Sequence, residues 1–337
     1  MKRFGGRSTK APKRRHFMLA AAASLASRPI LAQAKAPRRI VILMSLDEDH
    51  AEAEQRTDAM RQRLQELGWL EGGNIHVDYR WGAPNLEAID AQTVELLAAN
   101  PDVVVSTGTE ATRAVMKANR TTSVVFVLVV DPVAEGIVPN LARPGGIVTG
   151  FSGFDSSMGG KWLQVLKQCV PGLSRVAALA HPDLFPVEVF HKWIVPSAGA
   201  LGLDIALSPV RGVADVDAVA ASYGRQSNGG LLILPDAFTV SNGQAILEAA
   251  ARGRLPAIYP YRFFAASGGL ISYGIDVPDL YRRSADYVAR ILGGAKAGDL
   301  PVQNPAKFEL VFNLKTAKTL GITAPASLLA AADDVIE

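Results

Sequence analysis

Small polar and aromatic residues stand directly after several predicted strands, at positions where they could bind a ligand. In open parallel sheets, ligands bind beyond the carboxyl ends of the strands and at the N-termini of the helices that follow. The residues at such positions are Ser45, Leu46, Thr107, Gly108, Thr109, Asp131, Pro132, His181, Asp236, Tyr259, Tyr261 and Asp276. Hydroxyls, amides and one or two aspartates suit a carboxylate or zwitterionic ligand, and the aromatic residues suit an apolar body. The pattern predicts a binding site for a small molecule of this kind.

We expect a ligand carboxylate to meet Thr107, Thr109 and nearby amides. An amine or hydroxyl group would meet Asp131, Asp236 or Asp276. Each of these residues also has a purely structural explanation. Hydroxyls after strands cap helices, Asp and Pro form turns, and tyrosines pack in cores with their hydroxyls bonded. The prediction of a ligand site therefore rests on the recurrence of such groups at the same end of two sheets.

Sequence motifs of enzymes are sparse. The chain has no P-loop, no G-x-S-x-G elbow and no H-E-x-x-H pattern. The histidines after the N-terminal segment have no metal-ligand spacing; they are His50, His76, His181 and His191. Cys169 falls on the apolar stripe of a predicted helix, as expected of a buried, inert thiol. We expect no catalysis, cofactor or metal. The alternative, an α/β hydrolase or isomerase, requires a paired base and nucleophile in the cleft.

Buried strands and amphipathic helices must position these residues. The first series of apolar runs predicts strands at 40–44, 75–79, 103–106, 124–130 and 147–151, with helices at 50–67, 85–99, 109–119 and 133–142. The second series predicts strands at 176–180, 205–210, 231–234, 257–259, 270–273 and 308–312, with helices at 156–169, 187–201, 214–225, 241–252 and 278–292 and a closing helical segment. Because the strands are apolar on both faces, helices must cover both. The fold class is α/β, with two doubly wound parallel-sheet lobes.

Composition narrows the class of protein. The 337 residues are 49% hydrophobic and 20% charged, which excludes a disordered or fibrous chain. The length predicts about two domains of roughly 150 residues. One cysteine excludes a disulfide framework within the chain.

The net charge of +3 belongs to the N-terminal segment, which is typical of an export signal. A basic head through Arg15 precedes a short alanine-rich apolar run and Ala32-Gln33-Ala34, a small-residue cleavage site. Arg14-Arg15-His16-Phe17-Met18 resembles the twin-arginine signature; the general secretory route and a disordered basic tail on a cytoplasmic protein are the alternatives. Cleavage after Ala34 leaves 27 basic and 32 acidic side chains, a net charge of about −5. The mature protein offers no basic excess for nucleic acid, and the apolar run is too short to span a membrane.

Motifs along nearly all of residues 38–337 carry a family resemblance. They are Gly68–Gly72, Val77–Trp81, Asp131–Val133, Leu141–Gly146, Thr149–Ser152, Lys161–Leu163, Pro256–Tyr259, Gly268–Gly274, Lys307–Lys315 and Asp333–Glu337. In this order they resemble the substrate-binding proteins of ABC transporters, in the group related to tryptophan- and tyrosine-binding components. Three departures from the family pattern appear. Ile147 stands where many members have Asn, which concerns a side-chain turn cap. His181 replaces a common Asn before Pro182 at a position expected to face the cleft, and Ser45-Leu46-Asp47 has no clear family pattern, so these two concern the choice of ligand.

The resemblance implies a type I periplasmic-binding fold whose lobes are joined by three crossing segments and close on a ligand at a hinge. It implies an N-terminal lobe of residues 37–152 plus 273–303 and a C-terminal lobe of 153–272 plus 304–337, after the signal of 1–34. It also implies a periplasmic location, a permease and an ATPase of the inner membrane as partners, and an amino-acid-like ligand. A periplasmic sensor for a signalling receptor is the alternative role. A repressor would need an N-terminal helix-turn-helix, for which residues 1–36 are too short.

Overall fold

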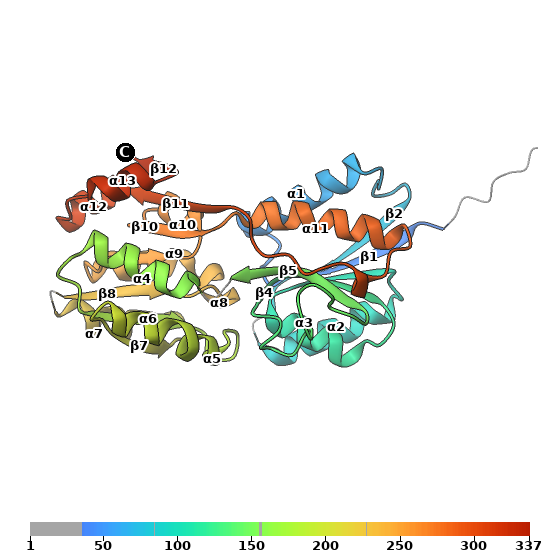
Figure 1. The fold of residues 1–337 in the computed structure, drawn as a ribbon, viewed down its shortest axis with the longest axis horizontal. Helices are drawn as coiled ribbons and strands as arrows, with labels where there is room; N and C mark the ends of the chain where they lie inside the picture. The colour runs from blue at the N-terminus through green and yellow to red at the C-terminus, as the bar shows by residue number, and fades with distance from the viewer. Residues whose placement is uncertain (1–35, 84, 155–156, 227) are drawn as a thin grey trace, which may run out of the picture. The chain divides into compact units, whose positions relative to one another are not determined.

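Two β-sheets carry the fold, one of five strands and one of seven (Figure 1). In order across the first sheet lie β2 (Ile75–Arg80), β1 (Arg38–Leu43), β3 (Val103–Thr107), β4 (Ser123–Val130) and β5 (Val148–Phe154). Across the second lie β12 (Asp334–Ile336), β11 (Phe308–Asn313), β10 (Ile271–Ile275), β9 (Ala257–Tyr259), β8 (Gly229–Ile233), β6 (Arg175–Ala180) and β7 (Asp204–Pro209). The computed structural model describes residues 36–83, 85–154, 157–226 and 228–337. The export signal predicted for residues 1–34 lies outside them.

Thirteen α-helices alternate with these strands in the described residues. They are α1 (Ala51–Glu66), α2 (Leu86–Ala98), α3 (Thr109–Ala118), α4 (Ser157–Cys169), α5 (Val187–Val189), α6 (Val195–Ala200), α7 (Val213–Gly224), α8 (Ala237–Ser241), α9 (Gly243–Arg252), α10 (Arg262–Ala266), α11 (Val277–Leu292), α12 (Leu314–Leu320) and α13 (Ala326–Ala331). A π-helix spans Phe190–Ile194 and a 3₁₀ turn spans Ala297–Asp299. None of the helices in this part of the chain is long and apolar enough to cross a membrane.

Alternate residues of β1 face opposite layers of the first sheet, as a strand covered on both sides requires. Ile40 and Ile42 belong to the core cluster that includes residues of α1 and α11, whereas Val41 and Leu43 belong to the cluster with residues of α2 and α3. Although far apart in sequence, α1 and α11 lie side by side (Figure 1). The predicted α/β class with doubly wound sheets is confirmed.

One strand pair departs from the predicted parallel arrangement. β11 runs antiparallel to β10, while every other strand pair of the two sheets is parallel. The chain leaves β10 to form α11, which packs against β4 and β5 of the first sheet, and then returns to the second sheet. Because it re-enters from the first sheet, β11 begins at the end where β10 stopped.

One predicted helix is wrong. Residues 133–142 form turns, because Gly136 has a φ of +66° and Pro139 lacks the N–H that a helix requires. The predicted closing helical segment is confirmed as α12 and α13, and an additional short strand, β12, extends the second sheet beside β11. The predicted helix 187–201 exists, but a π-helical turn interrupts it.

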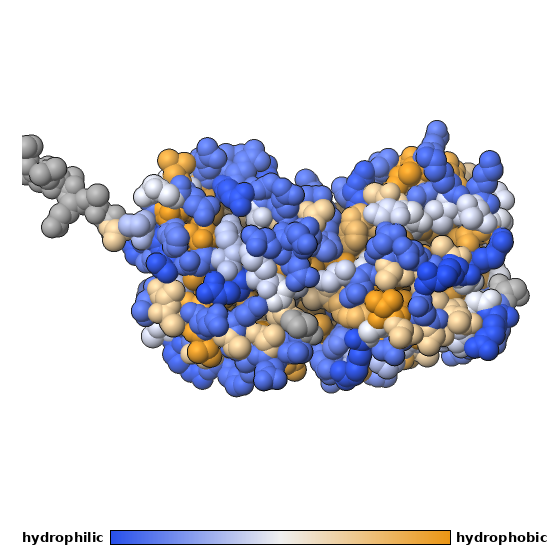
Figure 2. Space-filling view, turned by 180° about the vertical axis from the view of Figure 1, so that it is seen from behind, coloured by the Kyte–Doolittle hydropathy of each residue, from blue (hydrophilic) through white to orange (hydrophobic). Residues whose placement is uncertain are grey.

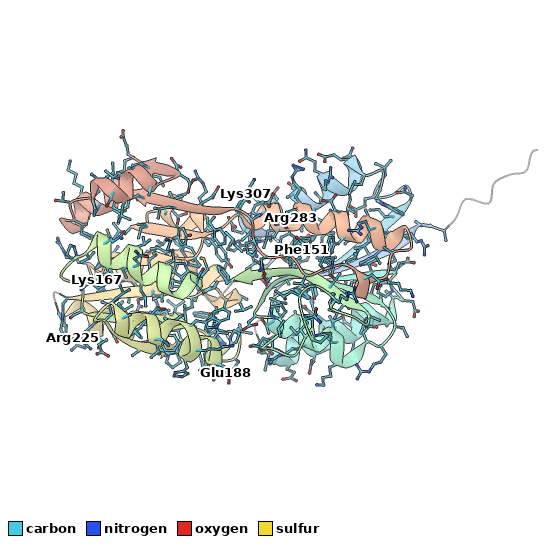
Figure 3. All side chains as sticks on the ribbon, in the orientation of Figure 1. Phe151, Lys167, Glu188, Arg225, Arg283 and Lys307 are labelled. Carbon is cyan, nitrogen blue, oxygen red and sulfur yellow. The ribbon has the colours of Figure 1, made fainter. Side chains whose placement is uncertain are left out.

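The chain passes between the sheets at three places (Figure 3). β5 leads into α4, β10 leads into α11, and the segment that follows α11 runs back along β5 before β11. In this last segment, Gln303 pairs with Phe151, and the Asn304 side chain bonds the Ser152 hydroxyl at 2.7 Å. Arg283 lies over the Phe151 ring, 5.2 Å from its centroid. Backbone and side-chain contacts therefore hold these passing segments together.

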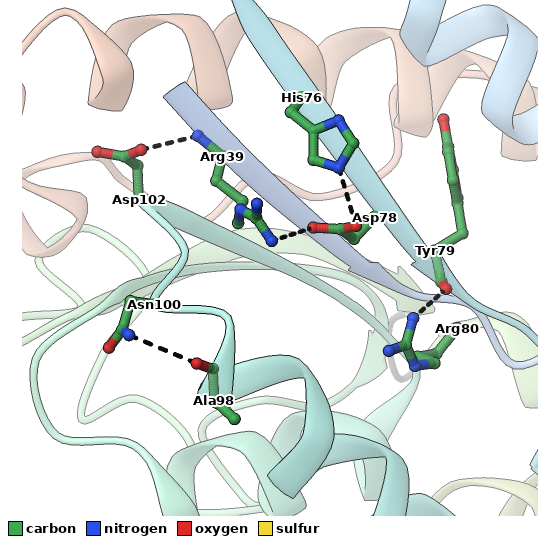
Figure 4. Close-up of polar contacts among 8 residues, drawn as sticks. All are labelled: Arg39, His76, Asp78, Tyr79, Arg80, Ala98, Asn100 and Asp102. Carbon is green, nitrogen blue, oxygen red and sulfur yellow. Dashed lines mark hydrogen bonds and ion pairs between the residues drawn. The ribbon is translucent and has the colours of Figure 1, made fainter. Parts of the chain in front are cut away.

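Hydrogen bonds and ion pairs of charged side chains connect β1, β2 and β3 toward their amino ends (Figure 4). Asp102, before β3, accepts the backbone N–H of Arg39 at 2.8 Å, and the Arg39 guanidinium bonds Asp78 of β2 at 3.1 Å. His76 lies 3.1 Å from the same Asp78 carboxylate. The charged network thus occupies the edge opposite the carboxyl ends of the strands, and the ligand-binding residues predicted for this sheet lie at the other edge.

Gly274 allows β10 and the residues after β9 to approach each other closely. A Cβ at this position would overlap the carbonyl oxygen of Pro260, a backbone atom that cannot rotate away. We expect Gly274→Ala to lower the free energy of unfolding by about 3 kcal/mol or more. Urea unfolding followed by circular dichroism measures this. Gly199→Ala, in the open helix α6, is the matched control and should leave the unfolding midpoint unchanged or slightly higher. Equal midpoints for the two variants would contradict this account of β10.

Candidate functional site

A cavity lies where the carboxyl ends of strands from both sheets meet. Residues that follow β1, β3, β8 and β9 contribute to its lining, and so does the end of β4. Its volume, counted as the space open to the centres of water molecules, is about 80 Å³. Since one water requires roughly 10–15 Å³ on this measure, the cavity has room for a small organic molecule. Hydrophobic patches on the face shown in Figure 2 are small and scattered among hydrophilic residues, so this internal cavity is the stronger candidate site.

Apolar side chains dominate the lining, and a few polar groups converge on it. The polar and glycine positions are Ser45, Arg56, Thr107, Gly108, Thr109, Glu110, Asp236 and Tyr261. Seven residues predicted from the sequence are therefore brought together here: Ser45, Leu46, Thr107, Gly108, Thr109, Asp236 and Tyr261. Five others do not line the cavity: Asp131, Pro132, His181, Tyr259 and Asp276.

The turn from β3 into α3 forms the polar part of the first-sheet wall. Gly108 takes a φ of +87° at this turn, which a glycine adopts without strain. α3 begins at the next residue, so its first-turn N–H groups and the positive end of its dipole lie at the cavity. The Thr109 hydroxyl accepts the backbone N–H of Val130 at 3.3 Å, and that of Thr107 lies 2.6 Å from the Tyr281 hydroxyl. This wall suits a negatively charged ligand group.

A bulge in β4 places Leu128 in the cavity and turns Asp131 away from it. Leu128 has a φ of +65°, and the pairing of β4 with β5 shifts register around it. Asp131, with a φ of +41°, accepts the backbone N–H of Ala134 at 3.1 Å and lies 3.6 Å from Lys192. Strained backbone of this kind persists where surrounding structure holds it, often at functional sites. Pro132 belongs to the turn after Asp131, where its carbonyl accepts two backbone N–H groups.

Asp236 is the acidic group of the second-sheet wall. It caps α8 by accepting the N–H of Thr239 at 2.8 Å, and its other oxygen accepts the N–H of His181 at 2.8 Å. Burial raises the pKa of Asp236 to about 6, although these backbone hydrogen bonds act in the opposite direction. His181 therefore contacts the site through its backbone, while its ring accepts the N–H of Asp183 and packs against Phe238. Burial also lowers the pKa of His181.

The structure places the two predicted tyrosines, Tyr259 and Tyr261, in different environments. Tyr261 lines the cavity, whereas Tyr259 is stacked on Phe264 within the core, with ring centroids 4.9 Å apart. Burial raises the pKa of both hydroxyls. Asp276 caps α11 by accepting the N–H of Asp279, and it lies 3.5 Å from Lys307 in a separate surface hollow. Strand ends alone do not distinguish these residues from those at the cavity, because each follows its strand equally closely.

Arg56, Phe154 and Leu184 line the cavity and were not predicted to do so. Arg56 carried a usable signal, since it lies on the apolar stripe of α1 with Met60 and Leu64. A charged residue at a buried helical position calls for a partner. Phe154 and Leu184 carried no such signal, because they reach the cavity only through the path of the chain between the sheets.

The raised pKa of Asp236 predicts a component of stability that depends on pH. The ordinary value is 3.8, so between about pH 4 and pH 6 the unfolded chain has released a proton that the folded protein retains. Stability should fall as the pH rises through this window, by on the order of 3 kcal/mol at most. Asp236→Asn, which preserves a capping side chain, should abolish this component in urea unfolding at a series of pH values. Asp183→Asn removes an exposed carboxylate whose pKa Arg211 lowers, and should leave the component in place. If the free energy of unfolding of Asp236→Asn still falls with rising pH in this window, the assignment of the component to Asp236 is wrong.

Comparison with known proteins confirms the family resemblance. The sequence model of the family described as ABC transporter substrate binding protein matches residues 40–336. The tyrosine-binding protein of Clostridioides difficile is 22% identical over 274 residues, which cover 81% of this chain and 78% of that protein. A conserved domain protein from Vibrio cholerae has a TM-score of 0.82 at 26% identity, covering 88% of this chain and 99% of the other. An ABC domain from Streptococcus pneumoniae, solved in complex with L-Trp, has a TM-score of 0.81 at 22% identity, covering 89% and 100%. The fold is therefore the type I periplasmic-binding fold, and the chain belongs to the ABC transporter substrate-binding proteins.

Proposed function

We propose that this substrate-binding protein captures a small amino-acid-like ligand with an apolar body for import. One observation carries the proposal: a mainly apolar cavity has hydroxyls and a helix N-terminus on one wall and a buried, acidic Asp236 on the other. A zwitterion with an apolar side chain complements these three features at once. The tyrosine-binding and L-Trp-bound relatives support a ligand of this class.

The proposed capture is a hinge closure of two lobes around the ligand. The N-terminal lobe comprises residues 37–152 and 273–303, and the C-terminal lobe comprises 153–272 and 304–337. The cavity lining supports this division because Thr107 and Thr109 come from the first lobe and Asp236 and Tyr261 from the second. A ligand that contacts both walls binds the closed state better than the open one and so shifts the population toward closure.

The proposed setting is the periplasm, beside an inner-membrane permease and ATPase. The family supports these partners, and the basic, alanine-rich segment 1–34 supports export. In this role the protein delivers its ligand and performs no chemistry on it.

Calorimetry on protein that has been unfolded, washed and refolded tests the ligand class. We expect heat and a thermal shift with L-Trp, L-Tyr or another apolar amino acid. Asp236→Asn should weaken amino-acid binding by about tenfold or more, because a neutral amide replaces the buried carboxylate that faces the ligand amine. The same variant should bind the analogue without the amine, such as indole-3-propionate, as well as the wild type does. No heat and no thermal shift across the amino acids would exclude this ligand class.

Charged residues of both lobes meet in a separate hollow outside the cavity, and they should tune closure. Lys192 lies 3.6 Å from Asp131 of the first lobe, whereas the Glu188 carboxylate raises the pKa of Glu135 as a like charge, after burial and a neighbouring Glu110. Because Lys192 is largely exposed, each interaction contributes at most about 1 kcal/mol and is screened by salt. We expect Lys192→Gln to weaken ligand affinity a few-fold and Glu188→Gln to strengthen it, both only at low salt.

Titration calorimetry at low and high salt measures both changes. Arg225→Gln is the control, since Figure 3 places Glu188 at the end of the second lobe that faces the first and Arg225 at the opposite end. Opposite signs for Lys192→Gln and Glu188→Gln and no change for Arg225→Gln are the expected result. Arg225→Gln removes the same charge as Lys192→Gln, so an equal weakening by these two variants would show that net charge acts, and not these contacts.

A further inference from the structure

Arg56 is the most unusual buried residue of this protein. Its side chain is 2% exposed and lines the cavity from α1. Its neighbours along the same helix face, Met60 and Leu64, are core residues. A buried guanidinium cannot lose its charge in a protein, so its location demands compensation from hydrogen bonds and an opposite charge.

The surrounding residues compensate Arg56 only in part. The Tyr281 hydroxyl lies 2.6 Å from that of Thr107; burial raises the pKa of Tyr281, and the nearby guanidinium of Arg56 acts in the opposite direction. The nearest carboxylate is Glu52, whose Oε2 lies 3.9 Å from Nη2, too far for a hydrogen bond. Throughout the described part of the chain, neither Nε nor Nη2 has a hydrogen-bond partner.

The two unpartnered nitrogens form one edge of the guanidinium. Their N–H groups point in parallel, in the geometry that binds both oxygens of a carboxylate. The Glu52 carboxylate lies near Nη2, at one end of this edge, and accepts no hydrogen bond from it. Across the cavity, Asp236 presents the opposite charge. The first-lobe wall therefore carries a cation, Arg56, together with Glu110, and the second-lobe wall carries an anion, Asp236.

We propose that Arg56 is the carboxylate receptor of this protein and makes it selective for ligands with a free carboxylate. The inference rests on the proposed function and deepens it, since it names the group that holds the ligand's acidic end. Thr107 and the start of α3 then line the place where that end lies. The ligand's amine faces Asp236, so an amino acid spans the two lobes in one orientation. A sugar, polyol or amide offers only neutral oxygens to the unpartnered edge of Arg56 and brings no negative charge to neutralise it.

Binding to the refolded full-length protein tests this without any substitution. The probes are L-Trp and L-Tyr, the corresponding amides, and tryptamine and tyramine, which lack the carboxylate. We expect the amides and amines to bind about 100-fold or more weakly than the amino acids, as a site with an unsatisfied buried group requires. Equal affinity for an amino acid and its amide would overturn the role of Arg56 and leave the amino-acid proposal standing. No binding of any probe would overturn both.

Variants then assign the selectivity to Arg56. The double variant Glu52→Gln/Arg56→Met removes the ion pair as a unit, so that no unpaired charge is left buried. It should bind the amino acid and its amide with nearly equal, weak affinity. Arg63→Met, the same change two turns along α1 at the protein surface, should retain wild-type selectivity. Arg56→Lys keeps the positive charge but lacks the two parallel N–H groups of the guanidinium, so it should show intermediate selectivity. This variant provides the test if the double variant does not fold. Undiminished preference for the carboxylate in any folded Arg56 variant would overturn the proposal.

Discussion

Parallel strands end together at one edge of a sheet, and the site of this protein depends on that constraint. In each sheet the residues after the strands gather at the carboxyl edge, and the cavity lies where these two edges meet. The charged network of Arg39, Asp78 and Asp102 stabilises the opposite edge of the first sheet. The stabilising charged network thus lies at the amino ends of the strands, and the candidate binding site lies at their carboxyl ends. This separation lets the site keep partly satisfied polar groups without weakening strand pairing.

Burial determines how the two charged side chains Asp236 and Arg56 can interact with a ligand in the cavity. Asp236 is held by two backbone N–H groups and has a raised pKa, while Arg56 keeps two donors unpartnered. Each group costs free energy in the empty protein, and each cost falls when an opposite charge arrives. An apolar lining strengthens both interactions because it excludes water. The proposed affinity for a zwitterion and the proposed discrimination against neutral solutes would then have one physical origin.

Much of the fold could be predicted from the sequence because it is local. Strands such as 103–107 and 123–130 are short, largely apolar runs, and helices such as 277–292 show one apolar face. The predictions failed where the local residue pattern suggested one structure and particular residues or the path of the chain imposed another. Residues 133–142 resemble a helix in composition but contain Gly136 and Pro139, and β11 became antiparallel because the chain returns from the first sheet. The π-helical turn at 190–194 has no periodicity of its own and could not be predicted.

The sequence by itself determined the α/β class, the family motifs and a set of twelve positions from which a site could be built. Only the tertiary structure decided that Thr107, Asp236 and Tyr261 share a cavity, while Tyr259 enters the core and Asp276 caps a helix. Only the packing of α1 against α11 showed that Arg56 is buried beside Tyr281. Periodicity follows from interactions between residues close in sequence, so it can be predicted from the chain alone. Which residues after the strands share a cavity depends also on contacts between distant parts of the chain, such as those of Thr107 with Tyr281 and of Asp236 with His181, and local periodicity does not encode them.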